Sequence, residues 1–120
     1  MKEIKKFEEA IAGKFKTLEE AEINGTMYWA YRNSKHAGNK LIDFNEVIWE
    51  EDIEQIIITC KENNIKEFTI SSRMSDLIET LVAFEKFGCK MNGLTEVNAP
   101  YKEWNTNNFA IIPAIKMILV

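Results

Sequence analysis

The chain has 120 residues, 46% of them apolar and 28% charged, a balance typical of one folded domain that buries about two thirds of its unfolded surface. Its net charge of −4 disfavours direct binding to nucleic acid, whose phosphate backbone attracts basic proteins. No apolar run approaches the ~20 residues that span a bilayer, and residues 1–6 lack the apolar stretch of a signal peptide. We therefore expect a cytoplasmic protein that binds neither membrane nor nucleic acid directly.

Helices are predicted near the start of the chain. Apolar residues at helical spacing predict a helix over residues 2–12. Thr17 and Glu20 form a capping-box pattern that predicts a short second helix. Asn24 and Gly25 supply the left-handed exit that would end this helix.

A pair of antiparallel strands is predicted next. Residues 26–32 are dense in aromatic side chains, which favour strands. Residues 33–39 contain turn residues, and residues 40–49 are predicted to be the second strand of the pair.

The second half of the chain alternates between helical and strand patterns. The predicted elements are a helix over residues 50–63, a strand over 66–71, a helix over 75–87, a strand from residue 89, a polar loop over 98–108 and a strand over 109–120. The last strand is apolar on both faces, so we expect it inside the sheet, with a bulge or an unpaired edge at Pro113. The fold class is α/β (α+β): one domain over residues 1–120 with a mixed sheet flanked by helices, in the order α-α-β-β-α-β-α-β-β.

Two cysteines, Cys60 and Cys89, are too few for a disulfide framework. Free cysteine is among the most buried residue types, so we predict reduced thiols in the core. A single histidine leaves the chain without the ligands of a structural zinc site. We predict no metal and no cofactor.

The order of elements from residue 40 resembles the core of the N-acetyltransferase superfamily (GNAT). Two phrases carry the resemblance, residues 60–70 and residues 83–90, the second being similar to the family's helix-end phrase of aromatic, Glu, Lys, apolar and Gly. The family binds the pyrophosphate of coenzyme A on a Gly-rich loop at a helix N-terminus. Residues 45–52 occupy that junction here with no glycine and four carboxylates. The resemblance therefore implies the architecture of the family without its coenzyme A loop, and none of its functional residues.

A second resemblance lies in residues 28–34, 37–39 and 43–49. These phrases are similar to small uncharacterised proteins of Gram-positive gut bacteria and their mobile elements. This resemblance implies an accessory or anti-defence role against a host protein.

An acidic run is the clearest anomaly, because residues 43–54 contain six carboxylates and no Lys or Arg. Carboxylates in the first turn of a helix are stabilised by its dipole. Three interpretations remain open for the run: a solvated surface, a patch that meets a basic partner, and oxygen ligands for Mg²⁺ or Ca²⁺. The predicted contact residues for a partner are Asp43, Glu46, Glu50 and Glu51, with Tyr101 and Trp104 of the polar loop.

Several polar residues are candidates for a ligand site. His36 has Asp43 or Glu46 as a potential partner and could then deprotonate Ser34, although an exposed loop histidine is the commoner case. Residues 71–73 follow a strand, where hydroxyls beside an arginine can hold an anion or cap the next helix. The complete candidate set is Tyr31, Arg32, Ser34, His36, Ser72 and Arg73.

We predict from these patterns a non-catalytic module that binds a protein partner. The alternative is an acyltransferase-like enzyme or a small-ligand-binding domain that uses the six polar candidates. A homodimer is also open, because the apolar end of the chain at residues 118–120 could complete a partner's sheet.

Overall fold

The computed structural model describes all residues, 1–120. In chain order the elements are α1 (Lys5–Ile11), α2 (Gly25–Ala37), β1 (Asp43–Phe44), the 3-10 helix η1 (Glu50–Asp52), α3 (Ile53–Glu62), β2 (Glu67–Ile70), α4 (Leu77–Lys86), β3 (Cys89–Lys102) and β4 (Phe109–Leu119). The four strands form one sheet in the order β1-β2-β4-β3, in which β1 and β2 are parallel and the other pairs antiparallel. The mixed α+β class is therefore confirmed.

The hydrophobic core lies against the sheet face that carries Phe44, Phe68 and Met117. Phe68 lies opposite Met117 in the register, so the two side chains share a face. The ring of Phe68 lies 5.3 Å from that of Phe44 and 5.4 Å from that of Phe84 on α4. Because this contiguous cluster also takes in residues of α1, α2 and α3, one core joins all the helices to the sheet.

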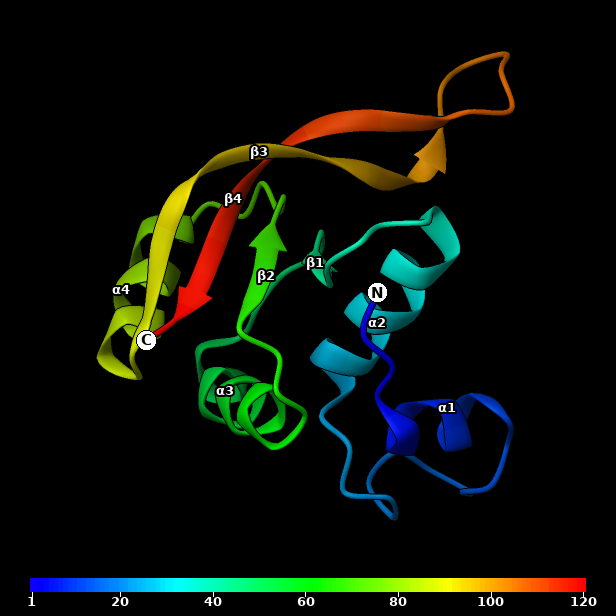
Figure 1. Ribbon diagram of the computed structural model, residues 1–120, viewed down its shortest axis with the longest axis vertical. Coiled ribbons are helices and arrows are strands. Elements are labelled where there is room, and N and C mark those ends of the chain that lie inside the picture. The colour runs from blue at the N-terminus through cyan, green and yellow to red at the C-terminus, as the bar shows by residue number, and fades with distance from the viewer.

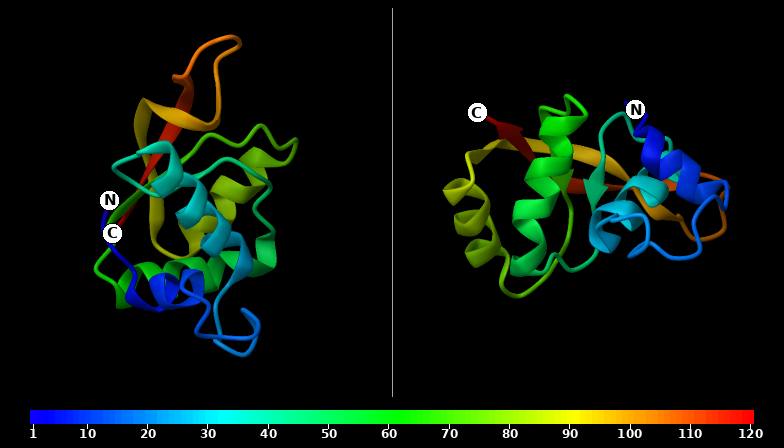
Figure 2. Two further views of the ribbon diagram at one scale, coloured as in Figure 1. Left: turned by 90° about the vertical axis from the view of Figure 1, so that its right-hand side faces the viewer. Right: turned by 90° about the horizontal axis from the view of Figure 1, so that it is seen from below.

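Strands β3 and β4 form a long, curved hairpin that completes the sheet beside β2 and extends from α4 to α2 (Figure 1). The Asn39 side chain fixes its far half: its Nδ2 donates to the Asn98 carbonyl at 2.8 Å, and its Oδ1 accepts from the Asn98 amide at 2.8 Å. Beyond this clamp the turn at residues 103–108 projects from the molecule (Figure 2). The hairpin is thus fixed by the pairing of β4 with β2 and by the Asn39 side chain, and its tip projects beyond both contacts.

The strand predicted at residues 26–32 is wrong, because these residues belong to helix α2. Asn24 begins that helix, since its Oδ1 accepts from the Met27 amide at 3.0 Å. Gly38 ends it in the left-handed conformation at φ 75°. The aromatic content of these residues favours a strand, but capping at both ends selects the helix.

The prediction of a second helix after Thr17 is also wrong. Thr17 Oγ1 does accept from the Glu20 amide at 3.0 Å, but the chain continues only as a turn. Glu22 takes a left-handed conformation at φ 57°, which ends any helical run, and Asn24 caps the next helix instead.

The strand predicted over residues 40–49 is reduced to the two residues of β1, which pair with β2 and not with residues 26–32. The other edge of β1 is closed by a side chain, because Ser34 Oγ on α2 accepts from the Asp43 amide at 2.7 Å. No antiparallel partner can occupy that edge, and residues 45–49 turn away from the sheet.

The second half of the chain follows the prediction, with α3, β2, α4, β3 and β4 in the expected order. Strand β4 lies inside the sheet between β2 and β3, as predicted. Pro113 has one unpaired edge, because β2 pairs with β4 only from Ile115 to Ile118; the bulges of the hairpin lie elsewhere. Strand β3 extends through residues expected in the polar loop. None of the helices combines the length and apolar character needed to cross a membrane.

Candidate functional site

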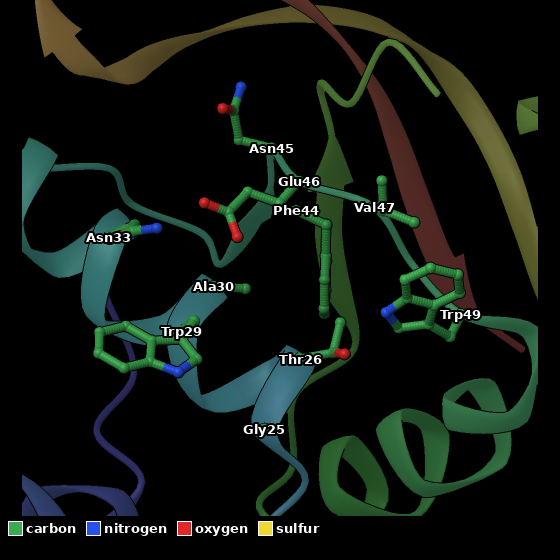
Figure 3. Close-up of a pocket in the computed structure, with 10 residues that line it drawn as sticks. All are labelled: Gly25, Thr26, Trp29, Ala30, Asn33, Phe44, Asn45, Glu46, Val47 and Trp49. Carbon is green, nitrogen blue, oxygen red and sulfur yellow. The ribbon is translucent and has the colours of Figure 1, made fainter. Parts of the chain in front are cut away.

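A pocket of about 520 Å³ opens between α2 and the segment that follows β1 (Figure 3). We call it the Trp29–Trp49 pocket after the two large aromatic side chains that border it. Its lining residues are Gly25, Thr26, Trp29, Ala30, Asn33, Phe44, Asn45, Glu46, Val47 and Trp49. The parts of the chain that form it are therefore the N-terminal half of α2 and the residues 44–49, which leave the sheet.

A side-chain latch fixes these two walls relative to each other. Asp52 in η1 accepts from Asn24 Nδ2 at 3.0 Å and from Thr26 Oγ1 at 2.7 Å. Asn24 is also the N-cap of α2, so one residue both starts the helix and ties it to the segment that carries Trp49. The latch gives the pocket a defined shape before any ligand arrives.

The two tryptophans are half exposed, at 49% for Trp29 and 60% for Trp49. Large aromatic side chains that remain this exposed are typical of interaction surfaces. The Arg32 guanidinium lies 5.1 Å from the centre of the Trp29 indole, a cation–π distance, but Arg32 does not line the pocket. The pocket side of Trp29 is therefore not covered by this arginine.

Glu46 is the only charged residue that lines the pocket. Its side chain is exposed and forms none of the three ion pairs of the structure. Figure 3 shows its carboxylate directed toward α2, with the two indoles on opposite sides of the opening. The pocket is thus acidic and aromatic in character.

Asp43, three residues earlier, is placed quite differently, because only 3% of it is exposed. Its carboxylate accepts from Thr69 Oγ1 at 2.6 Å and from Ser71 Oγ at 2.5 Å. Asn45 Nδ2 donates in turn to Ser71 Oγ at 2.9 Å. Burial raises the pKa of Asp43, against the opposing effect of the two hydroxyl donors.

Of the four predicted acidic contact residues, the structure brings Glu46, Glu50 and Glu51 to the surface and buries Asp43. Asp43 has a structural reason for its position, since it joins β1 to β2 through hydroxyl groups. No cluster of three or more His, Cys, Asp or Glu side chains has the arrangement of a metal site. The run therefore has four exposed carboxylates: Glu46 at the Trp29–Trp49 pocket, Glu50 and Glu51 in η1, and Glu54 in the first turn of α3.

The six polar candidates do not converge on one site. Tyr31 is buried; its hydroxyl donates to the Glu8 carboxylate at 2.7 Å and accepts from the Ile4 amide at 3.3 Å. Burial, followed by the hydrogen bond to Glu8, raises the pKa of Tyr31 to about 12. Hydrogen bonds from Lys35 and Tyr31 lower the pKa of Glu8. This cluster ties α1 to α2.

The other candidates lie on separate parts of the surface or in backbone contacts. Ser34 bonds to the backbone of Asp43, so it is not positioned as a nucleophile beside a base. His36 is exposed, with its ring 5.4 Å from that of Phe109 on β4. Ser72 follows β2 and is buried, and its backbone amide donates a hydrogen bond to the Phe44 carbonyl. Arg73 is exposed.

The two aromatic residues predicted to contact a partner are exposed at the end of the hairpin. Tyr101 is 54% exposed on β3, and Trp104 is 91% exposed in the turn. Cys60 and Cys89 lie in the core, as predicted, and burial raises the pKa of each thiol to about 12.

Trp29 and Trp49 are not among the site residues predicted from the sequence, although both line the pocket. A helical reading of residues 25–37 would have found Trp29, because Met27, Ala30 and Tyr31 form the buried face and Trp29 lies off it.

The fold and the pocket define an α+β domain whose open site is aromatic and acidic, with no assembled nucleophile and base. The chain belongs to the family described as Domain of unknown function (DUF7698), whose model matches residues 26–119. The match includes every residue that lines the pocket except Gly25. No curated protein and no solved structure matches the chain.

Proposed function

We propose that this protein is a non-catalytic module that binds a basic protein partner through the Trp29–Trp49 pocket and the carboxylates beside it. The observation that carries the proposal is the pocket itself, where two half-exposed indoles flank a carboxylate that has no cation of its own. Aromatic anchors in a partly formed pocket are the usual centre of a protein–protein contact.

The charges around the pocket support a basic partner. Glu50 and Glu51 are exposed and, like Glu46, take part in none of the ion pairs. No Lys or Arg lies between residues 43 and 54 to neutralise them. A surface that carries several unpaired carboxylates attracts a basic protein and increases the rate of association with it, and it repels an acidic protein.

The hairpin tip is a second contact in this proposal. Tyr101 at the end of β3 and Trp104 in the turn lie beyond the clamp that joins Asn39 to Asn98. A partner that covers the pocket near the start of α2 and reaches the hairpin beyond its C-terminal end would bury both aromatic regions.

The proposal is tested by comparing what two forms of the tagged protein retain from a lysate of the cells that encode it. The double charge reversal E46K/E50K should release a basic protein that the wild type retains, and raising the salt concentration should release it from the wild type as well. Retention of the same proteins by both forms would contradict the proposal.

The matched control is E79K/E85K on α4, which makes the same change in net charge on two exposed glutamates of another face. It should retain the partner. The identity of the partner also tests the accessory or anti-defence role implied by the mobile-element resemblance, since that role requires a host protein.

A further inference from the structure

We propose that the Trp29–Trp49 pocket is a receptor for one arginine side chain of the partner, stacked on an indole and paired with Glu46. The inference rests on the proposed function and specifies the chemical group that the pocket takes. It follows from three features of the pocket: its charge, its aromatic walls and its fixed shape.

The charge of the pocket selects a cation. Glu46 is the only charged lining residue, and its carboxylate has no partner within the protein. Asn33 lines the same space, and its side-chain amide is directed toward the opening as a further polar group (Figure 3). A cationic group that enters the pocket would therefore be attracted by the Glu46 carboxylate, whereas an anion would be repelled by it.

The aromatic walls select a planar cation. A guanidinium stacks on an indole face and presents parallel N–H groups to a carboxylate, whereas an ammonium is a compact and strongly hydrated charge. The molecule already contains this contact, because the guanidinium of Arg32 lies over the Trp29 ring outside the pocket. An arginine from a partner would make the equivalent contact inside it.

The latch formed by Asp52 prepares the pocket for this ligand. It joins Asn24 and Thr26 at the start of α2 to the turn that follows Trp49. Holding the two walls in place before binding reduces the ordering that the ligand must impose. A single side chain can then be recognised by a small site.

The experiment uses the three tryptophans as reporters. The full-length protein is titrated with the tripeptide Gly-Arg-Gly, and the indole N–H signals of Trp29, Trp49 and Trp104 are followed by NMR. We expect saturable shifts at Trp29 and Trp49 and none at Trp104, which is 91% exposed on the distant hairpin tip. Gly-Lys-Gly should bind more weakly, and Gly-Glu-Gly should not shift the signals.

Two variants test the assignment of the pairing group. E46Q changes an exposed side chain that lines the pocket, and it should weaken Gly-Arg-Gly binding about tenfold, the effect of removing one charge-assisted contact. E79Q on α4 should leave binding unchanged. Equal shifts at all three indoles, no shift at Trp29 and Trp49, equal binding of the arginine and lysine peptides, or E46Q binding as wild type would each overturn the proposal.

The result separates this inference from the proposed function. If E46K/E50K releases the partner but the arginine peptide does not reach the pocket, the protein binds a basic partner without an arginine receptor, and the inference fails alone. If the peptide shifts the signals of the two pocket indoles but E46K/E50K releases no protein, the pocket binds arginine and the proposed binding of a basic protein partner is overturned.

Discussion

Two carboxylates only three residues apart are used in opposite ways. Asp43 is buried with two hydroxyl donors on its oxygens, whereas Glu46 is exposed at an aromatic pocket with no donor at all. The Asp43 carboxylate is satisfied by hydrogen bonds within the protein, whereas the Glu46 carboxylate is free to bind a group from another molecule. A carboxylate without a partner beside two exposed indoles is therefore a better indicator of binding than a buried carboxylate with a raised pKa.

Substitution of the buried Asp43 should have the largest effect on the free energy of unfolding. Asp43→Ala should lower the free energy of unfolding by about 3 kcal/mol, because it leaves the Thr69 and Ser71 hydroxyls without their acceptor in a buried site. Urea denaturation monitored by circular dichroism measures this. A loss below about 1 kcal/mol would show that the cluster does not hold β1 to β2 as described.

The latch between the pocket walls predicts an intermediate effect. Asp52→Ala removes the acceptor for Asn24 and Thr26 at a half-buried site, so it should cost about 1–2 kcal/mol of unfolding free energy. The same denaturation experiment measures it. Hydrogen exchange should also become faster at the first turn of α2, and unchanged exchange there would contradict the latch.

The raised pKa of Asp43 predicts how its contribution changes with pH. In the unfolded state Asp43 loses its proton near the ordinary pKa of 3.8, whereas in the folded state it loses the proton at a higher pH. The contribution of Asp43 to the free energy of unfolding is therefore lost as the pH rises from 3.8 through the folded-state pKa. The stability of the wild type relative to Asp43→Asn should therefore be greatest below pH 3.8 and decrease as the pH rises. A difference that grows with pH, measured by denaturation between pH 3 and pH 7, would show that the hydroxyl donors outweigh burial.

Substitution of the exposed Glu46 should have the smallest effect on the free energy of unfolding. Glu46→Gln should change the unfolding free energy by no more than about 0.5 kcal/mol, as is usual for surface sites without specific contacts. Thermal unfolding checks this. A large loss of stability would mean that Glu46 supports the fold, and it would remove the contrast with Asp43.

The fold of residues 50–120 could be predicted because its signals are local. Ile53, Ile56, Ile57 and Cys60 repeat at helical spacing, and all four are buried on one face of α3. The strand predicted at residues 26–32 is wrong because aromatic content favours a strand there, whereas the cap at Asn24 begins a helix. The aromatic residues that favour a strand also fit a helix, because Tyr28 and Tyr31 are three residues apart and both are buried in α2.

The candidate site could be predicted only in part. The exposure of Glu46, Glu50 and Glu51 follows from their charge, but the burial of Asp43 depends on hydroxyl groups 26 and 28 residues away. The pocket depends in the same way on the contact of Asp52 with Thr26, 26 residues earlier in the chain. Contacts of this range follow from the packing of α2 against residues 44–49, which a local pattern does not encode.

Cross-linking of the captured complex with a carbodiimide, which joins carboxylates to lysine amines in contact, would locate the partner on the surface of the protein. Cross-links are expected from Glu46, Glu50 or Glu51 to the partner, and they should be lost when the complex is dissociated by salt. Cross-links confined to Glu79 and Glu85 on α4 would place the partner on another face and contradict the account.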